Sequence, residues 1–135
     1  AVSLRDGRRV PGILQKGLAA ALQTGNNLRL PKEDFIFILE DVGEEIAEEP
    51  GFEGFHVPMD KKGARLLTTV HNKLVNTQNE DLVHWWKIFH IAKEDFTIPS
   101  KNWEGVNWGL FSGDDDAMKI FVGRIVEHMD RLEIP

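Results

Sequence analysis

Short apolar runs alternate with amphipathic segments in the second half of the chain, and this order limits what the chain can fold into. Residues 66–71 (LLTTVH) are apolar and β-branched, which is typical of a buried strand, and residues 96–98 (FTI) are a second strand candidate. Helical patterns follow each run, at residues 80–93 and 114–132. We expect Ile134 to begin a further strand. The order predicts an α/β fold in which residues 66–135 form half of a parallel-sheet (βαβα) domain with right-handed crossovers.

The first fifty residues carry helical signals only. Residues 12–23 place apolar side chains at helical spacing, and Gly25 is suited to a left-handed cap behind them. Pro31 then opens a second helix over residues 32–49, whose apolar stripe we expect to comprise Phe35, Ile38, Leu39, Val42 and Ile46. We therefore expect a helical segment (1–50), a linker loop (51–65) and a partial βαβα domain (66–135) that continues beyond the chain end. Because the sequence opens on Ala1 and carries no tag or tail, we interpret it as a piece of a longer protein.

Apolar spacing also predicts which face each later helix buries. In the last helix the expected buried stripe is Met118, Val122, Ile125, Met129 and Leu132. In residues 80–93, Trp85 and Trp86 are adjacent, so both are buried only where two sides of the helix are covered. Contact with the sheet on one side and with another domain or subunit on the other would do this. An amphipathic indole at the surface is the alternative.

Composition excludes several classes of function. A net charge of −6 gives no electrostatic footprint for nucleic acid, and the short basic run at residues 5–9 (RDGRR) reads as a solvated end. The chain contains no cysteine, which excludes disulfides, thiolate nucleophiles and all-cysteine metal or iron–sulfur sites within it. No apolar run reaches the roughly 18 residues of a membrane span. We therefore expect a cytoplasmic chain without direct membrane insertion.

Histidines and acids give weak metal signals. The five histidines include no His-x-x-x-His pair, although a site combining His71 with a helix histidine and a carboxylate remains open. Asp114, Asp115 and Asp116 stand together at a helix start, where acids complement the helix dipole. Ser112 lies three residues before Asp115, which predicts a capping box.

A glycine-rich loop precedes the last helix. Its glycines surround Asn107, Trp108 and Ser112, in the sequence GVNWGLFSG. The spacing matches neither GxGxxG nor a P-loop, and the aspartates after it would repel a phosphate. We expect close approach of this backbone to a neighbouring element or to a cofactor held elsewhere.

Residues 66–133 resemble the iron–sulfur subunits of the heterodisulfide-reductase-like family. The similarity rests on the acidic-led helix start EDLV (80–83), the run IFHIAKEDFTIPS (88–100) and the loop GVNWGLFSGDD (105–115). The segment GNNL (25–28) followed by Pro31 is similar to the stretch that leaves the ferredoxin-like region of that family.

The resemblance implies an oxidoreductase subunit that passes electrons among [4Fe–4S] clusters toward a thiol or disulfide substrate. The family places ferredoxin-type cysteines upstream and CCG-type cysteine motifs downstream, and this chain has neither. Where many relatives have a cysteine after the first strand, this chain has His71, Asn72 and Lys73. No cluster ligand is carried over, so we expect the clusters in the parent protein and a non-catalytic chain here.

These observations predict a docking fragment of a cytoplasmic iron–sulfur oxidoreductase subunit, attached to a membrane complex through its partners. The expected partners are the other domains of the parent protein and further electron-transfer subunits. His71, Asn107, Trp108 and Ser112 are the residues expected near a cluster, because they follow a strand or precede a helix at the ligand-facing edge of a parallel sheet. The alternatives are a stand-alone protein-interaction module and, from the histidines and acids, a metal-dependent enzyme. An incomplete sheet also predicts self-association of the isolated chain.

Overall fold

The computed structural model describes residues 10–135, and the basic run at residues 5–9 lies outside this part. Helices dominate it, together with a small parallel sheet, so the coarse prediction of a mixed α/β chain is confirmed. In chain order the elements are α2 (Gly12–Thr24), α3 (Lys32–Ala47), β1 (Leu66–Leu67), α4 (Asn72–Asn76), α5 (Asn79–Ile91), β2 (Phe96–Thr97), α6 (Trp108–Ser112) and α7 (Asp115–Arg131).

The first two helices begin and end close to the predicted positions. Gly25 adopts φ 87° behind α2 and donates its N–H to the carbonyl of Ala21 at 3.0 Å, as expected of a left-handed cap. Pro31 is the N-cap of α3. Four of the five predicted stripe residues of α3, Phe35, Leu39, Val42 and Ile46, are buried, and Ile38 is half-buried.

The sheet is much shorter than the predicted strands. β1 and β2 pair in parallel with Leu66 opposite Phe96 and Leu67 opposite Thr97. Single bridges extend the pairing, from Val70 to Glu104 and from Met59 to Ile98. The first strand ends early because the chain turns into α4 directly after His71, whose Nδ1 accepts from the N–H of Lys73 at 3.0 Å.

Ile134 is not in a strand, which corrects the expectation that it begins one. Its N–H instead donates to the carbonyl of Met129 at 2.9 Å, so the chain here folds back onto the end of α7.

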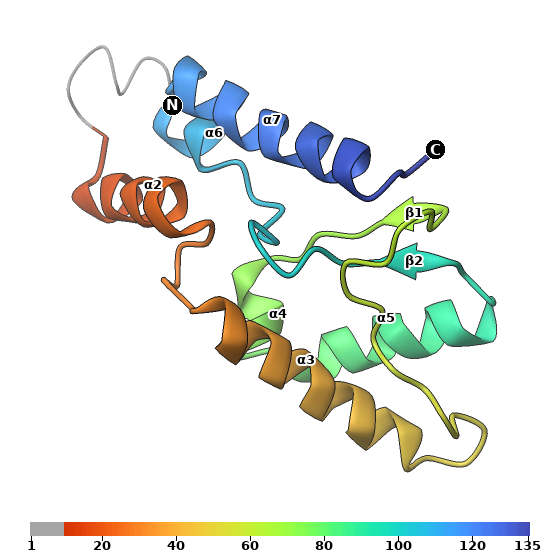
Figure 1. Ribbon diagram of the computed structural model, residues 1–135. Coiled ribbons are helices and arrows are strands. Elements are labelled where there is room, and N and C mark those ends of the chain that lie inside the picture. Colours follow the sequence, from red (N-terminus) through yellow and green to blue (C-terminus); the bar gives the residue numbers. More distant parts are fainter. Residues whose placement is uncertain (1–9) are drawn as a thin grey trace.

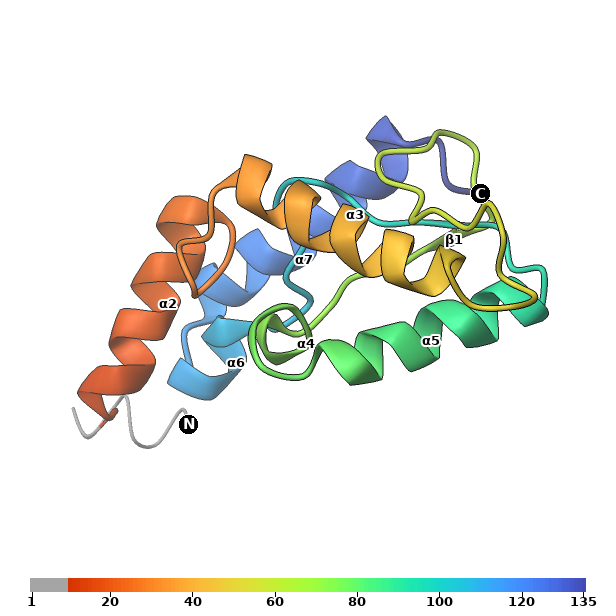
Figure 2. The same cartoon turned by 90° about the horizontal axis from the view of Figure 1, so that it is seen from below.

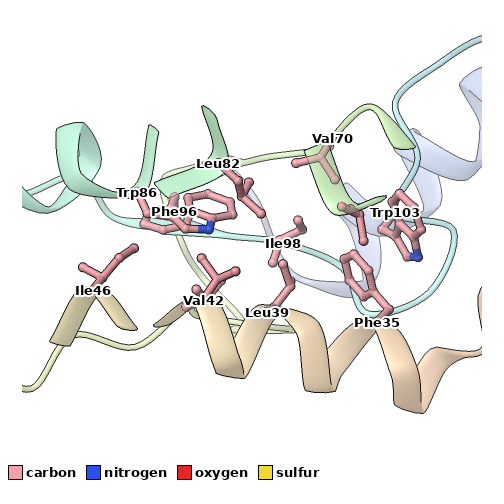
Figure 3. Packing of buried hydrophobic residues seen from close by; sticks show 12 residues of the cluster. Phe35, Leu39, Val42, Ile46, Val70, Leu82, Trp86, Phe96, Ile98 and Trp103 are labelled. Atoms are coloured by element: carbon pink, nitrogen blue, oxygen red, sulfur yellow. The ribbon is translucent and has the colours of Figure 1, made fainter. Parts of the chain in front are cut away.

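The sheet separates two groups of helices (Figures 1 and 2). Helices α3 and α5 lie on one side of it and α7 on the other. The main core fills the space between α3, α5 and the sheet (Figure 3). There Phe35 stacks on Trp103 with ring centroids 4.5 Å apart, and Trp86 stacks on Phe96 at 5.1 Å. Each stacked pair contributes about 1 kcal/mol beyond the free energy gained from burying its surface.

A second, smaller apolar cluster joins α2 to α6 and α7. Ala21, Ala117 and Phe121 are its buried members, and Leu18 and Trp108 pack against them. The helical segment at residues 1–50 therefore contributes to two clusters, α2 to this one and α3 to the main core.

In the second half of the chain, two short helices were missed and one cap was predicted wrongly. The five-residue helices α4 and α6 were not predicted, because five residues are too few to show a helical period. The capping box was wrong as well. Ser112 ends α6, and Asp114 is the N-cap of α7, its side chain accepting from the N–H of Ala117 at 3.0 Å. No helix within residues 10–135 is both long and apolar enough to cross a membrane.

Candidate docking surface

The structure brings three of the four predicted site residues together in and beside α6. Asn107 is the N-cap of α6, and Trp108 and Ser112 are its first and last residues. The Asn107 amide donates to the carbonyl of Met118 at 3.3 Å, which ties α6 to α7. His71 lies apart from them, exposed at the start of α4.

A buried carboxylate, which sequence reasoning missed, connects the two places. Glu104 accepts from the indole Nε1 of Trp108 at 2.6 Å, from the Nδ2 of Asn72 at 3.0 Å and from the backbone N–H of Asn27 at 2.5 Å. These donors come from α6, from α4 beside His71, and from the turn between α2 and α3. The sequence gives one signal for this buried carboxylate, namely an acid between Trp103 and Gly105 in a stretch with few other charges.

The polar atoms around α6 are poor ligands for a metal or an iron–sulfur cluster. They are an amide, an indole, a hydroxyl and the single carboxylate of Glu104, and the buried Ser112 Oγ and Asn107 Oδ1 have no hydrogen-bond partner among the described residues. A [4Fe–4S] cluster takes cysteine thiolates, which this sequence lacks. No group of three or more histidine, aspartate or glutamate side chains suited to a metal ion occurs in residues 10–135. The residues present therefore do not fit a cluster.

A serine, an aspartate and a histidine meet near the end of α7, but not as a catalytic triad. The Ser100 hydroxyl donates to Asp60, and Arg131 donates to the same carboxylate at 2.9 Å. Burial opposes ionisation of Asp60, yet these two donors outweigh it and hold its pKa below the usual value. The buried His128 faces the carbonyl of Asn102 at 3.2 Å rather than Ser100, so this histidine is not placed to act as a base for the hydroxyl.

Helix α7 carries the most informative surface, because its buried side is not the one that its apolar pattern predicts. The buried residues of α7 are Ala117, Phe121 and His128. Of the predicted stripe, only Leu132, at the C-cap, is buried. Val122, Val126 and Met129 are exposed by 54%, 51% and 37%, with Met118 and Ile125 half-buried beside them. We call Val122, Val126 and Met129 the α7 face.

Two polar side chains explain why α7 is turned in this way. Arg124 donates to the carbonyls of Ala21 and Leu22, at 2.8 Å each, in the last turn of α2. His128 lies only 4% exposed against the carbonyl of Asn102. Burial lowers the pKa of both side chains. These bonds fix the orientation of α7 and leave its apolar side facing outward.

Other apolar side chains are exposed on α5 and α6. On α6, which packs against α7, they are Leu110 and Phe111, and on α5 they are Trp85, Ile88 and Ile91. Of the adjacent tryptophans of α5, Trp86 is buried in the core and Trp85 is 53% exposed.

Comparison of the chain with protein-family models, with curated proteins and with solved structures found no match.

Proposed function

We propose that this chain is a non-catalytic docking domain, which binds another protein domain through the α7 face. One observation carries the proposal. Helix α7 buries a histidine and part of an arginine while the apolar side chains of the α7 face remain exposed. Exposed apolar groups that line one side of an amphipathic helix are typical of a surface that a partner covers.

The energy available on this face supports a specific contact. Complete burial of a valine or methionine side chain contributes about 1.5–3 kcal/mol. The α7 face already hides about half of each side chain, so covering the rest would contribute roughly 1 kcal/mol per residue. Leu110 and Phe111 would add to this if the partner also reaches α6.

The iron–sulfur parent remains a prediction within this proposal. Docking is what the resemblance implies for a cysteine-free stretch. The element order from β1 to α7 supports half of a parallel-sheet (βαβα) domain. We propose that this half-domain belongs to a longer cytoplasmic protein. The test is the iron and acid-labile sulfide content of the protein purified anaerobically, with the 135-residue chain compared with a form extended into its gene on both sides. Iron in neither form would contradict the family assignment and leave a stand-alone interaction module.

The docking role is tested through self-association, because an uncovered apolar face of the isolated chain is expected to find a second copy. We expect light scattering at about 100 μM to show association of the unaltered chain and a monomer for the double variant V122E/V126E. The matched control is Ile120→Glu. Ile120 is 49% exposed but lies on roughly the opposite side of α7, at 100° of turn per residue.

The control variant should associate like the unaltered chain, and all three proteins should share the same circular dichroism spectrum. A monodisperse monomer for the unaltered chain, or equal association of the double variant, would contradict docking through α7.

A further inference from the structure

One edge of the parallel sheet has no partner. The N–H groups of Leu66 and Thr68 donate to the carbonyls of Asp95 and Thr97, at 3.0 and 2.9 Å, on the side of β2. Successive residues of a strand direct their backbone groups to opposite sides, so those of Leu67 and Thr69 point away from β2. Outside the pairing of β1 with β2, neither residue takes part in a backbone hydrogen bond within residues 10–135.

The other edge of the sheet is covered at Ile98. Beyond β2, Ile98 donates to the carbonyl of Pro58 and accepts from the N–H of Asp60, at 3.0 Å each. The segment around Met59 thus covers β2 on its outer side.

A small apolar groove adjoins this edge on the side of α5. Its volume is about 130 Å³, and it is lined by Thr68, Thr69, Val70, Leu74, Leu82, Trp85, Trp86 and Phe89. An apolar cavity of about 150 Å³ holds a benzene molecule, so this slightly smaller groove has room for one side chain of about leucine size. The exposed indole of Trp85 would lie against that side chain.

We propose that the β1 edge accepts an extended segment of a partner protein, with apolar side chains at alternate positions. Its backbone pairs with Leu67 and Thr69, and one apolar side chain fills the groove beside Trp85. Strand addition of this kind combines backbone hydrogen bonds with a side-chain pocket. A helix does not fit, because its own backbone groups are already paired and cannot satisfy those of β1.

A second copy of the chain does not supply this segment. If two β1 edges paired, the side chains that each copy could direct to the α5 side would be those of Thr68 and Val70. Both are held within their own domain, since Thr68 donates to the carbonyl of Thr97 and Val70 is buried in the core. Neither is free to enter the groove of the other copy.

The site is independent of the proposed docking through α7. Its groove is lined by residues of α4, α5 and the chain after β1, and α7 lies on the other side of the sheet from α5 (Figures 1 and 2). Failure of one proposal leaves the other standing.

The test uses a synthetic heptapeptide of alternating threonine and valine with leucine at its centre. Titration into the isotopically labelled 135-residue chain should shift the backbone amide signals of Leu67 and Thr69, protect both amides from hydrogen exchange, and shift the Trp85 fluorescence to shorter wavelength. A peptide with aspartate in place of the central leucine, and one with N-methylated backbone nitrogens, should each bind at least tenfold more weakly. Equal binding of either altered peptide would overturn the proposal, as would unchanged amide signals at millimolar peptide.

Variants of the chain provide a second readout. Leu67→Pro removes an N–H that the fold does not use, so the chain should stay folded and bind the heptapeptide at least tenfold more weakly. Trp85→Ala should reduce the affinity as well. Protection of the Leu67 amide that rises with protein concentration in the absence of peptide would show a second copy at the edge and would overturn the assignment.

Discussion

Replacing Glu104 with alanine is expected to lower the free energy of unfolding by about 4 kcal/mol. The carboxylate is almost fully buried and accepts three hydrogen bonds, from Asn27, Asn72 and Trp108. A hydrogen bond to a charged group contributes about 1.5–3 kcal/mol, and a buried donor left unpaired loses its hydration without compensation. We use the lower end of that range for each bond, because water can enter the space that alanine leaves.

Glutamine at the same position separates the effect of the lost hydrogen bonds on stability from the effect of the lost side-chain volume. Glu104→Gln keeps the volume and one accepting oxygen, but its NH₂ group then faces a donor. We expect a loss of about 1–2 kcal/mol, smaller than that of Glu104→Ala. The glutamine variant also keeps the test informative if the alanine variant does not fold.

The assay is urea unfolding at 25 °C and pH 7, followed by tryptophan fluorescence. The matched control is Glu45→Gln, an exposed position on α3 with no ion pair in residues 10–135, which should change stability by less than about 0.5 kcal/mol. If Glu104→Ala proves no more harmful than Glu45→Gln, Glu104 does not hold α4, α6 and the α2–α3 turn together.

Three further outcomes are expected from single residues. Gly25→Ala should cost about 2 kcal/mol in urea unfolding, since φ is 87° and the new Cβ would collide with the side chain of Asn102, whereas Gly12→Ala, in open space, should be close to neutral. Burial is the main cause that lowers the pKa of His128 in the folded state, so folding favours the neutral ring. The free energy of unfolding should therefore fall as the pH drops below the pKa of about 6.5 that histidine has in the unfolded chain. His128→Gln should remove that part of the pH dependence. Lys93→Gly should stabilise the chain by about 0.5–1 kcal/mol, because Lys93 holds φ 53° after α5, where glycine is unstrained; an unchanged thermal midpoint would refute this.

Elements with local signals could be predicted from the sequence. Gly25 ends α2, and the stripe from Phe35 to Ile46 lies in the core, because both depend on residues that are neighbours along one helix. The division between Trp85 and Trp86 was open in the sequence, since it depends on how many sides of α5 are covered.

Long-range contacts explain what could not be predicted. The face that α7 buries is set by Arg124 and His128, whose partners Ala21 and Asn102 lie far away in the sequence. The apolar stripe of a helix does not indicate that distant polar contacts will decide which face is buried. The buried position of Glu104 was not predicted for the same reason, because an isolated acid in a loop does not indicate which donors it will meet.

The candidate site was foreseen only in part. Asn107, Trp108 and Ser112 meet because they share one short helix, which the glycine-rich loop did not reveal. Their predicted nearness to a cluster remains a prediction.

The bonds from Arg124 to the end of α2 have a consequence for the order of events during synthesis. They join residues 102 and 103 positions apart, so α2 leaves the ribosome long before its partners exist. At roughly 5–20 residues per second, this delay is on the order of 5–20 s. The α3–α5 core can form in that interval, whereas the apolar side of α2 stays available to chaperones until α7 is complete.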